Sequence, residues 1–136
     1  MNKQISCSII LFLFGAAAAL GAPQLIAFER NDAVWIANLD GTGEKKIADG
    51  IFPAISPDGS RVAFNTVEKA SGTSYVRHMA VVEVATGKLN VFKDVPSNNS
   101  YYPSWTPDGK QILFTTRPHE GWDLVVVNAD GLTSTF

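Results

Sequence analysis

After its first 21 residues, the chain alternates short apolar runs with short polar turns. Leu25 to Glu29 and Ala33 to Asn38 are β-rich runs separated by polar Arg30-Asn31-Asp32, and the Asp40 to Gly43 turn leads into Glu44 to Ala48. Short runs rich in Val, Ile and Phe, bounded by Gly, Asp and Asn, are typical of strands. The pattern therefore predicts three strands of one sheet over residues 25–48.

Two further groups of runs follow, and each predicts four strands. In the second group, a long polar loop from Val67 to Ser74 separates the second strand from the third. The strands expected in this group are Ile51 to Ser56, Arg61 to Thr66, Val76 to Val84 and Leu89 to Lys93. The strands expected in the third group are Tyr101 to Thr106, Gln111 to Thr116, Trp122 to Val127 and Leu132 to Phe136.

The second and third groups share a motif at an offset of 50 residues. Residues 52–66 read FPAISPDGSRVAFNT, and residues 102–116 read YPSWTPDGKQILFTT. In each Pro-Asp-Gly turn, proline presets φ, aspartate accepts local backbone hydrogen bonds, and glycine adopts the positive φ that other residues resist. The motif predicts two hairpins. Their structural turn residues are Pro57, Asp58 and Gly59 in the first copy and Pro107, Asp108 and Gly109 in the second.

A second set of matches extends the repeat to the first group. The triplets at 26–28, 62–64 and 112–114 match one another, and the later turns at 40–41, 86–87 and 130–131 recur at intervals of 46 and 44 residues. Four-stranded units at this spacing are typical of β-propeller blades, which bury their inner strands on both faces. The sequence thus predicts an all-β fold, a partial β-propeller of about three four-stranded antiparallel blades over residues 25–48, 51–93 and 101–136, the first without its opening strand.

The first 21 residues have the features of a secretory signal peptide. Lys3 gives a positive start, Ile9 to Leu20 is an apolar run of 12 residues, and small residues at Ala19 and Gly21 precede a cleavage point before Ala22. A transmembrane anchor is the alternative, but 12 apolar residues fall short of the roughly 20 that a span needs. We therefore expect residues 1–21 to be removed, residues 22–136 to form the propeller in the periplasm or outside the cell, and no stable membrane span to remain after cleavage.

Composition argues against several kinds of site. The formal net charge of −2 gives no basic face for nucleic acid, and the single cysteine, Cys7, precedes the apolar run, so the mature chain has no disulfide and no thiolate ligand. The sequence lacks a Gly-x-Ser-x-Gly elbow, a His-Glu-x-x-His helix and a phosphate-binding glycine loop. We expect no catalytic residue, no cofactor and no metal site in this chain.

The histidines, the turn aspartates and two aromatic residues have structural explanations. His78 and His119 are the only histidines, and we expect them at the surface or at strand edges. Asp58 and Asp108 could be imagined as a catalytic carboxylate pair, but they occupy the same turn position in separate blades, and turn chemistry explains both. Trp105 and Phe114 are expected in the core rather than on a ligand platform.

The repeats resemble those of a known family. The two Pro-Asp-Gly segments, with Trp105 before the second turn and Phe64 and Phe114 after the turns, resemble the WD-type repeats of the TolB-like propeller family. The turns at 38–41 and 128–131 resemble that family's third-to-fourth-strand turn. The resemblance implies a six-bladed propeller that acts as a protein-binding platform in the bacterial periplasm. Such propellers also precede the catalytic domain of prolyl-oligopeptidase-type peptidases and form some secreted lyases. This sequence differs from TolB itself, because no α/β domain precedes the blades and only about half of the blades are present.

The longer connections are expected at one end of the sheets. In a meander, the tight turns lie at one end, which leaves the connections at 29–33, 67–75, 94–101 and 117–121 at the other. Loops grouped on one face of a rigid scaffold often carry binding, and aromatic and arginine residues are favoured at interfaces. Ordinary solvated loops are the alternative. The candidate partner-binding residues are Arg30, Asp32, Glu68, Lys69, Asn98, Asn99, Tyr101, Arg117, His119, Glu120 and Trp122.

These observations favour a non-enzymatic, secreted or periplasmic protein-interaction module whose partner is a protein of the cell envelope or the cell exterior. The alternative is a truncated N-terminal or accessory piece of a prolyl-oligopeptidase-type peptidase or a secreted lyase. Three blades leave two apolar outer faces, so a homodimer of two copies joined head to tail could supply about six blades and close the ring. A truncated chain that needs its missing half is the competing expectation.

Overall fold

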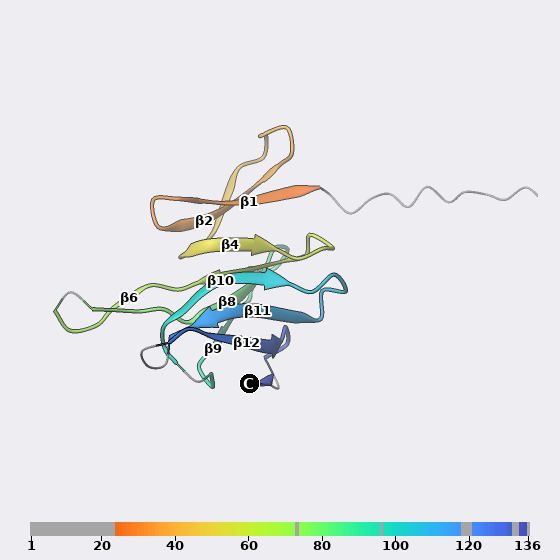
Figure 1. The fold of residues 1–136 in the computed structure, drawn as a ribbon. Helices are drawn as coiled ribbons and strands as arrows, with labels where there is room; N and C mark the ends of the chain where they lie inside the picture. Colours follow the sequence, from red (N-terminus) through yellow and green to blue (C-terminus); the bar gives the residue numbers. More distant parts are fainter. Residues whose placement is uncertain (1–23, 73, 96, 118–120, 132–133, 136) are drawn as a thin grey trace, which may run out of the picture.

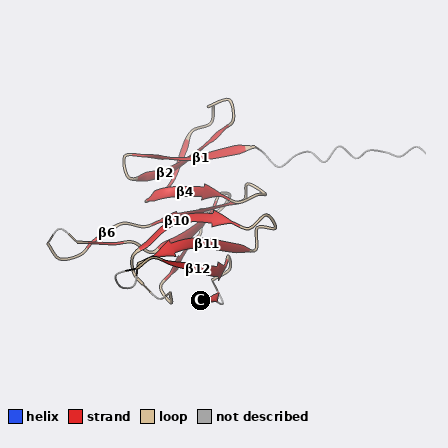
Figure 2. Ribbon diagram, viewed as in Figure 1, coloured by secondary structure: helices blue, strands red, loops and turns tan. Residues whose placement is uncertain are grey.

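The computed structural model describes residues 24–72, 74–95, 97–117, 121–131 and 134–135. Every regular element in these residues is a β-strand, and Figure 2 shows only strands and loops among them. No helix suited by length and apolarity to cross a membrane occurs in this part of the chain. The all-β expectation is confirmed. The expected signal segment and the candidates His119 and Glu120 lie outside the described residues.

The main strands form three antiparallel sheets, which we call blades 1, 2 and 3. Blade 1 consists of β1 (Leu25–Arg30), β2 (Ala33–Asn38) and β3 (Lys45–Asp49). Blade 2 consists of β4 (Ile51–Ile55), β5 (Arg61–Asn65), β8 (Met79–Glu83) and β9 (Leu89–Phe92). Blade 3 consists of β10 (Ser100–Trp105), β11 (Gln111–Thr116), β12 (Asp123–Asn128) and β13 (Ser134–Thr135). A two-stranded hairpin of β6 (Glu68–Lys69) and β7 (Tyr75–Val76) extends from blade 2.

The three sheets stack as layers, with blade 2 in the middle (Figure 1). Because successive side chains of a strand point to opposite faces, β5 contributes to two cores. Val62 and Phe64 pack in a core with Val34 of β2, whereas Ala63 packs in the other core with Phe114 of β11. These side chains are all at most 1% exposed. Burial on both faces explains why β5 and β8 are apolar at successive positions rather than at alternate ones.

Blades 2 and 3 are also joined by reciprocal polar contacts, which we call the clasp. The guanidinium of Arg61 lies over the Trp105 ring, 4.7 Å from its centroid, and its Nη2 donates to the Gly109 carbonyl at 2.7 Å. In the opposite direction, Trp105 Nε1 donates to the Ala54 carbonyl at 2.9 Å. Each blade therefore supplies a donor to a backbone carbonyl of the other.

The two ends of the stack differ, as expected. The Pro-Asp-Gly turns follow β4 and β10 at the right of Figure 1, and the β6–β7 hairpin extends at the left. We call these the tight-turn end and the loop end. The loop end holds the β1–β2 turn, the β6–β7 hairpin, the described residues between β9 and β10, and Arg117 just after β11.

Three local expectations were wrong. The segment from Glu29 to Ala33 is not a long connection but a two-residue hairpin turn, because Arg30 pairs with Ala33 and the central Asn31 and Asp32 have φ of 53° and 55°. Consecutive residues with positive φ are typical of the turn that matches strand twist, and Asn and Asp tolerate this conformation.

The expected loop from Val67 to Ser74 and the expected strand from Val76 to Val84 also differ from the structure. Most of the loop belongs to the β6–β7 hairpin, in which Glu68 pairs with Val76. The strand is divided into β7 and β8, because Arg77 leaves the blade 2 ladder and forms a parallel bridge with Asn99 instead. The apolar pattern of residues 76–84 does not reveal this change of partner.

Candidate protein-binding face

The two Pro-Asp-Gly turns share a pair of hydrogen bonds to the aspartate, and the Ser60 hydroxyl donates to Asp58 in addition. Asp58 Oδ1 accepts from Ser56 Oγ at 2.6 Å and from the Ser60 backbone N–H at 3.0 Å. Asp108 Oδ1 accepts from Thr106 Oγ1 at 2.6 Å and from the Lys110 N–H at 3.0 Å. Gly59 and Gly109 have φ of 71° and 67°, as the motif predicts.

These contacts define the electrostatics of both aspartates. Hydrogen bonds from the Ser56 hydroxyl and the Ser60 N–H lower the pKa of Asp58 to about 2, and the Thr106 hydroxyl likewise lowers the pKa of Asp108. A low pKa keeps both groups ionised, and neither carboxylate is placed against the other. The geometry fits two structural turns rather than a proton-transferring pair.

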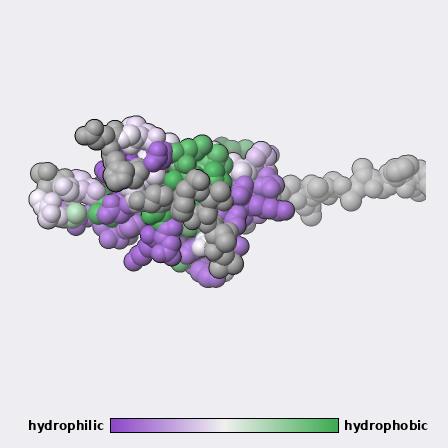
Figure 3. All heavy atoms as spheres, turned by 60° about the horizontal axis from the view of Figure 1, so that its bottom comes forward, coloured by the Kyte–Doolittle hydropathy of each residue, from purple (hydrophilic) through white to green (hydrophobic). Residues whose placement is uncertain are grey.

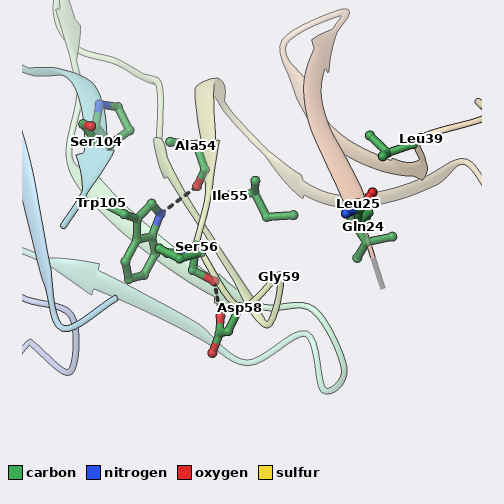
Figure 4. Close-up of a pocket in the computed structure, with 12 residues that line it drawn as sticks. Gln24, Leu25, Leu39, Ala54, Ile55, Ser56, Asp58, Gly59, Ser104 and Trp105 are labelled. Atoms are coloured by element: carbon green, nitrogen blue, oxygen red, sulfur yellow. Dashed lines mark hydrogen bonds between the residues drawn. The ribbon is translucent and has the colours of Figure 1, made fainter. Parts of the chain in front are cut away.

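A hollow of about 640 Å³ lies beside the first of these turns, at the tight-turn end (Figure 4). Ala54, Ser56, Asp58 and Trp105 lie on one side of it, and Leu25 lies across from them. Trp105 Nε1 is hydrogen-bonded to Ala54 and the Asp58 carboxylate to its own turn, as the dashed lines in Figure 4 mark. The most polar groups of this hollow therefore already have partners, which makes it a poor candidate for specific recognition.

At the loop end, the structure brings four of the expected site residues into one network. Tyr101 and Trp122 meet edge to face with ring centroids 5.2 Å apart, and the Arg117 guanidinium lies 5.9 Å from the Trp122 centroid. The Arg117 N–H donates to the Asn99 carbonyl at 3.3 Å. Trp122 is 57% exposed, so the network presents an aromatic surface to solvent.

The remaining described candidates lie apart from this network. Glu68 and Lys69 are exposed on the β6–β7 hairpin, Asn98 is exposed before β10, and Asp32 is at the tip of the β1–β2 turn. Arg30 belongs to the outer face of blade 1: it lies 5.0 Å from the centroids of both Phe28 and Trp35 and forms two hydrogen bonds, of 2.8 and 2.9 Å, with Glu44.

Two aromatic residues that we did not select from the sequence complete the surface. Phe52 lies 4.5 Å from Tyr102 and 6.5 Å from Tyr101, measured between ring centroids. Tyr102 is 62% exposed. We call Phe52, Tyr101, Tyr102 and Trp122 the aromatic cluster. It joins β4 and β10, the first strands of blades 2 and 3, to Trp122 just before β12.

Phe52 and Tyr102 have unusual backbone conformations. Both precede a proline and have positive φ, 55° and 53°, at equivalent positions where the β4–β5 and β10–β11 registers shift. The Phe52 N–H donates to Glu29 Oε2 at 3.1 Å, which ties this bulge to blade 1. Positive φ in bulky residues costs on the order of 1–3 kcal/mol and is concentrated at functional sites. The sequence signal was the aromatic-proline pair repeated 50 residues apart, which we interpreted only as part of the hairpin motif.

A groove of about 480 Å³ opens at the same end between blades 1 and 2. Its lining residues include apolar Ile51 and Val67 together with Tyr75, Asp32 and Arg77. Arg77 also contacts the aromatic cluster, because its Nη1 donates to Tyr101 Oη at 3.1 Å. The loop end thus combines an aromatic surface with a polar groove, and Arg77 connects them.

Comparisons with known proteins place this architecture. A scan of protein-family models finds no match. The chain is 24% identical over 139 residues to the protein TolB homolog of Chlorobaculum tepidum, a match covering 96% of this chain and 30% of the relative. It is 34% identical over 97 residues to tricorn protease homolog 1 of Streptomyces coelicolor, covering 68% of this chain and 9% of the relative. It is 29% identical over 89 residues to dipeptidyl-peptidase 5 of Porphyromonas gingivalis, covering 62% and 13%.

The solved structures decide the fold. TolB from Acinetobacter baumannii superposes with a TM-score of 0.64 at 20% identity, over 82% of this chain and 29% of that protein. The fold is that of a TolB-like β-propeller. The β-propeller domain of the trilobed protease from Pyrococcus furiosus, with a TM-score of 0.61 at 18% identity, covers 82% of this chain and 36% of that domain. Both the expected fold class and the resemblance are confirmed, and the TolB-like segment spans only 9% to 30% of the curated relatives named above.

Proposed function

We propose that this TolB-like propeller segment is a non-enzymatic protein-interaction module of the periplasm or the cell exterior, and that it binds its protein partner at the loop end. The observation that supports this proposal is the aromatic cluster with its two residues of positive φ, Phe52 and Tyr102. Exposed tyrosine and tryptophan supply large contact areas at low entropic cost, and they are enriched among the residues that dominate binding energy. The location rests on the expected signal peptide and on the TolB resemblance.

Site-specific photo-crosslinking in the producing cells tests this function. A photoreactive amino acid replaces Glu68 at the loop end in one variant and Lys110 at the tight-turn end in another; both positions are exposed. We expect a discrete protein adduct from position 68 and none from position 110. Combining the position 68 probe with Tyr102→Ala should reduce the adduct about tenfold or more, because an interface aromatic is lost.

Leu39→Ala is the matched control for that substitution. Leu39 is 60% exposed, close to the 62% of Tyr102, but lies at the tight-turn end. Its substitution should leave the adduct unchanged. Equal adducts from positions 68 and 110, or an adduct indifferent to Tyr102→Ala, would overturn the assignment of the loop end.

A second candidate function comes from the relatives named as peptidases. The matches to dipeptidyl-peptidase 5 and to tricorn protease homolog 1 favour a propeller part of a larger peptidase, of which this segment would be the N-terminal or accessory piece. The coding sequence after Phe136 tests this candidate. A downstream Gly-x-Ser-x-Gly with an aspartate and a histidine in the same reading frame would support it, and a stop codon there would contradict it.

We also propose that two copies associate through their outer blade faces. Leu124 on β12 is 63% exposed, and its register partner on β11 is Thr115, on the face opposite to the blade 2–blade 3 core. Figure 3 shows an apolar area on the side of the molecule where blade 3 lies, bordered by hydrophilic residues. An exposed apolar area of this kind is typical of an interface, and head-to-tail contacts that close produce rings.

A further inference from the structure

We infer that Arg77 forms a carboxylate-binding site in the loop-end groove, and that the partner of the proposed function presents a peptide carboxylate to it. The inference rests on that proposed function, since the ligand is part of the same protein partner. Its evidence is independent of the aromatic cluster, because it comes from the contacts of one guanidinium.

The backbone of Arg77 is fixed by blade 3. Its N–H donates to the Asn98 carbonyl at 2.8 Å, and its carbonyl accepts from the Ser100 N–H at 2.9 Å. These bonds form where residue 77 interrupts the blade 2 ladder between β7 and β8. A residue held by the neighbouring blade on both sides of its peptide is a rigid base for a binding side chain.

The guanidinium itself is held by aromatic rings. It lies 5.1 Å from the Tyr101 centroid and 5.7 Å from the Tyr75 centroid. Arginine is favoured for such positions because its planar, weakly hydrated head stacks on rings and still directs its donors outward. The stacking therefore restricts the orientation of the donors before any ligand arrives.

Only neutral acceptors contact this cation in the described part of the chain. Nη1 donates to Tyr101 Oη at 3.1 Å and to Asn99 Oδ1 at 3.4 Å, and the two ion pairs there are Arg30–Glu44 and Lys46–Asp49. The Nε of Arg77 is buried and has no hydrogen-bond partner among the same residues. Because a ligand cannot reach a buried atom, the donors left for a carboxylate are those of Nη2, which makes no hydrogen bond within the described residues. A hydrogen bond between a guanidinium and a carboxylate is roughly twice as strong as one between neutral groups.

Arg30 shows what the site would look like when filled. It too is stacked on two rings, those of Phe28 and Trp35, but its donors are occupied by both oxygens of Glu44. Two described arginines therefore contact two rings each, and one of them has a carboxylate partner whereas the other has none. The comparison points to a carboxylate as the missing partner of Arg77.

The residues that line the groove indicate which kind of anion it would bind. Asp32 and Asp49 also line the groove, and Asp49 is paired with Lys46. Because repulsion by these carboxylates increases with the charge of the ligand, a singly charged carboxylate is favoured over a dianion such as a phosphate monoester. A peptide carboxylate carries one charge and lies next to amide N–H groups, which those aspartates can accept. Its neighbouring side chain would contact Tyr75 and Val67, both exposed, at 50% and 37%. An apolar residue beside the carboxylate fits this lining best.

Binding of two small probes to the whole purified protein tests the inference. N-acetyl-L-phenylalanine carries the carboxylate beside an aromatic ring, and N-acetyl-L-phenylalaninamide differs only in lacking the charge. Titrations followed by NMR should show the acid binding about tenfold or more tightly than the amide, with shifts of the Arg77 guanidinium resonances. Equal affinities for the acid and the amide would overturn the inference without any substitution.

Variants assign the effect to one side chain. Arg77→Gln should weaken binding of the acid about tenfold or more, and Arg30→Gln, which removes the arginine already paired with Glu44, should leave it unchanged. Far-UV circular dichroism verifies that both variants are folded. Acid binding that persists in a folded Arg77→Gln variant would overturn the assignment.

Two further results are informative. One distinguishes a terminal carboxylate from a side-chain carboxylate, and the other distinguishes failure of the carboxylate site from failure of the proposed function. N-acetyl-L-aspartyl-L-phenylalaninamide offers a side-chain carboxylate: tighter binding than the terminal acid would indicate an internal acidic residue, and weaker binding a peptide C-terminus. If no acid binds but the cross-link from position 68 still depends on Tyr102, the carboxylate site is wrong and the proposed function stands.

Discussion

At the residue scale, the two turns show that a short motif can encode its own hydrogen bonds. The hydroxyl before each Pro-Asp-Gly turn has two roles: Ser56 Oγ donates to Asp58 and accepts the Arg61 N–H, and Thr106 Oγ1 does the same with Asp108 and the Gln111 N–H. A hydroxyl residue at this position therefore closes the turn from inside. The sequence predicted the aspartate and glycine roles because they follow from backbone preferences, whereas the hydroxyl role depends on the register across the turn.

Asp58→Asn should make the protein less stable at neutral pH by about 1 kcal/mol, a value reduced for the exposure of this carboxylate to solvent. An amide oxygen accepts the Ser56 and Ser60 donors less strongly than a carboxylate does. Because the folded pKa of Asp58, about 2, is below its ordinary value of 3.8, the contribution is fully present above pH 4 and disappears as the pH falls towards 2.

Urea denaturation of Asp58→Asn and the unmodified protein at pH 7, 4 and 2 measures this effect. The difference in the free energy of unfolding should shrink across that range. Asp94→Asn, which removes an exposed carboxylate after β9, is the control and should change the free energy of unfolding little at pH 7. A constant difference between pH 7 and 2 would mean that the ionised form of Asp58 does not stabilise the turn.

Among the elements, the strands that follow a Pro-Asp-Gly turn were predictable from the sequence. β5 and β11 were expected within one residue of their observed ends, because each begins after a Pro-Asp-Gly turn and is uniformly apolar at its centre. The β6–β7 hairpin and the bulges at Phe52 and Tyr102 were not expected. Their conformations depend on contacts with other blades, such as the bridge from Arg77 to Asn99, which no local pattern encodes.

The junction of blades 1 and 2 provides a test at this scale. Gly50 links β3 to β4 with φ of 154°, and a Cβ there would lie 2.5 Å from both the Asn65 carbonyl oxygen and Phe64 Cδ2. Gly50→Ala should therefore destabilise the fold by roughly 2–4 kcal/mol, because it adds a clash with a buried strand to the cost of its backbone conformation.

Gly87→Ala is the control for this substitution. Gly87 also has positive φ, 72°, but a Cβ there meets no atom within 4 Å, so only the backbone cost of about 1 kcal/mol is expected. Thermal and urea unfolding compare the two variants. Equal losses of stability would show that the close approach of blade 1 to β5 does not constrain the junction.

At the scale of the whole molecule, the repeat in the sequence was sufficient to predict a stack of blades. The offset of 50 residues identified β4 and β10 as equivalent strands of successive blades. Met79 and Val81 of blade 2 are buried against blade 3, as expected for a strand covered on both faces. Only some residues of the candidate site could be predicted from the sequence. Tyr101 and Trp122 were selected because they adjoin the expected long connections, although Tyr101 belongs to β10. Phe52, Tyr102 and Arg77 lie in or beside strands away from those expected ends, and only the stacking of blades places them at the loop end.

Light scattering on the purified mature protein tests the proposed association of two copies. We expect a discrete dimer, and we expect Leu124→Asp to convert it to monomer, because a charge would be buried at the interface. Leu124 is 63% exposed, so this substitution should leave the unfolding midpoint of the monomer nearly unchanged. Leu39→Ala, at an exposed apolar position of the tight-turn end, serves as the control. A dimer that persists in Leu124→Asp would show that blade 3 does not supply the interface.

The clasp between blades 2 and 3 means that the repeats are not interchangeable parts. The residue equivalent to Arg61 in the third blade is Gln111, and the residue equivalent to Trp105 in the second is Ile55, 50 residues away in each case. One copy has the cation and the other has the indole, so the contact between Arg61 and Trp105 forms only when blade 2 precedes blade 3. A chain in which these two blades were exchanged, or one was duplicated in place of the other, would retain every turn and strand but lose the contact that joins them. The order of the blades is therefore determined by the residues that differ between the copies, not by the residues that they share.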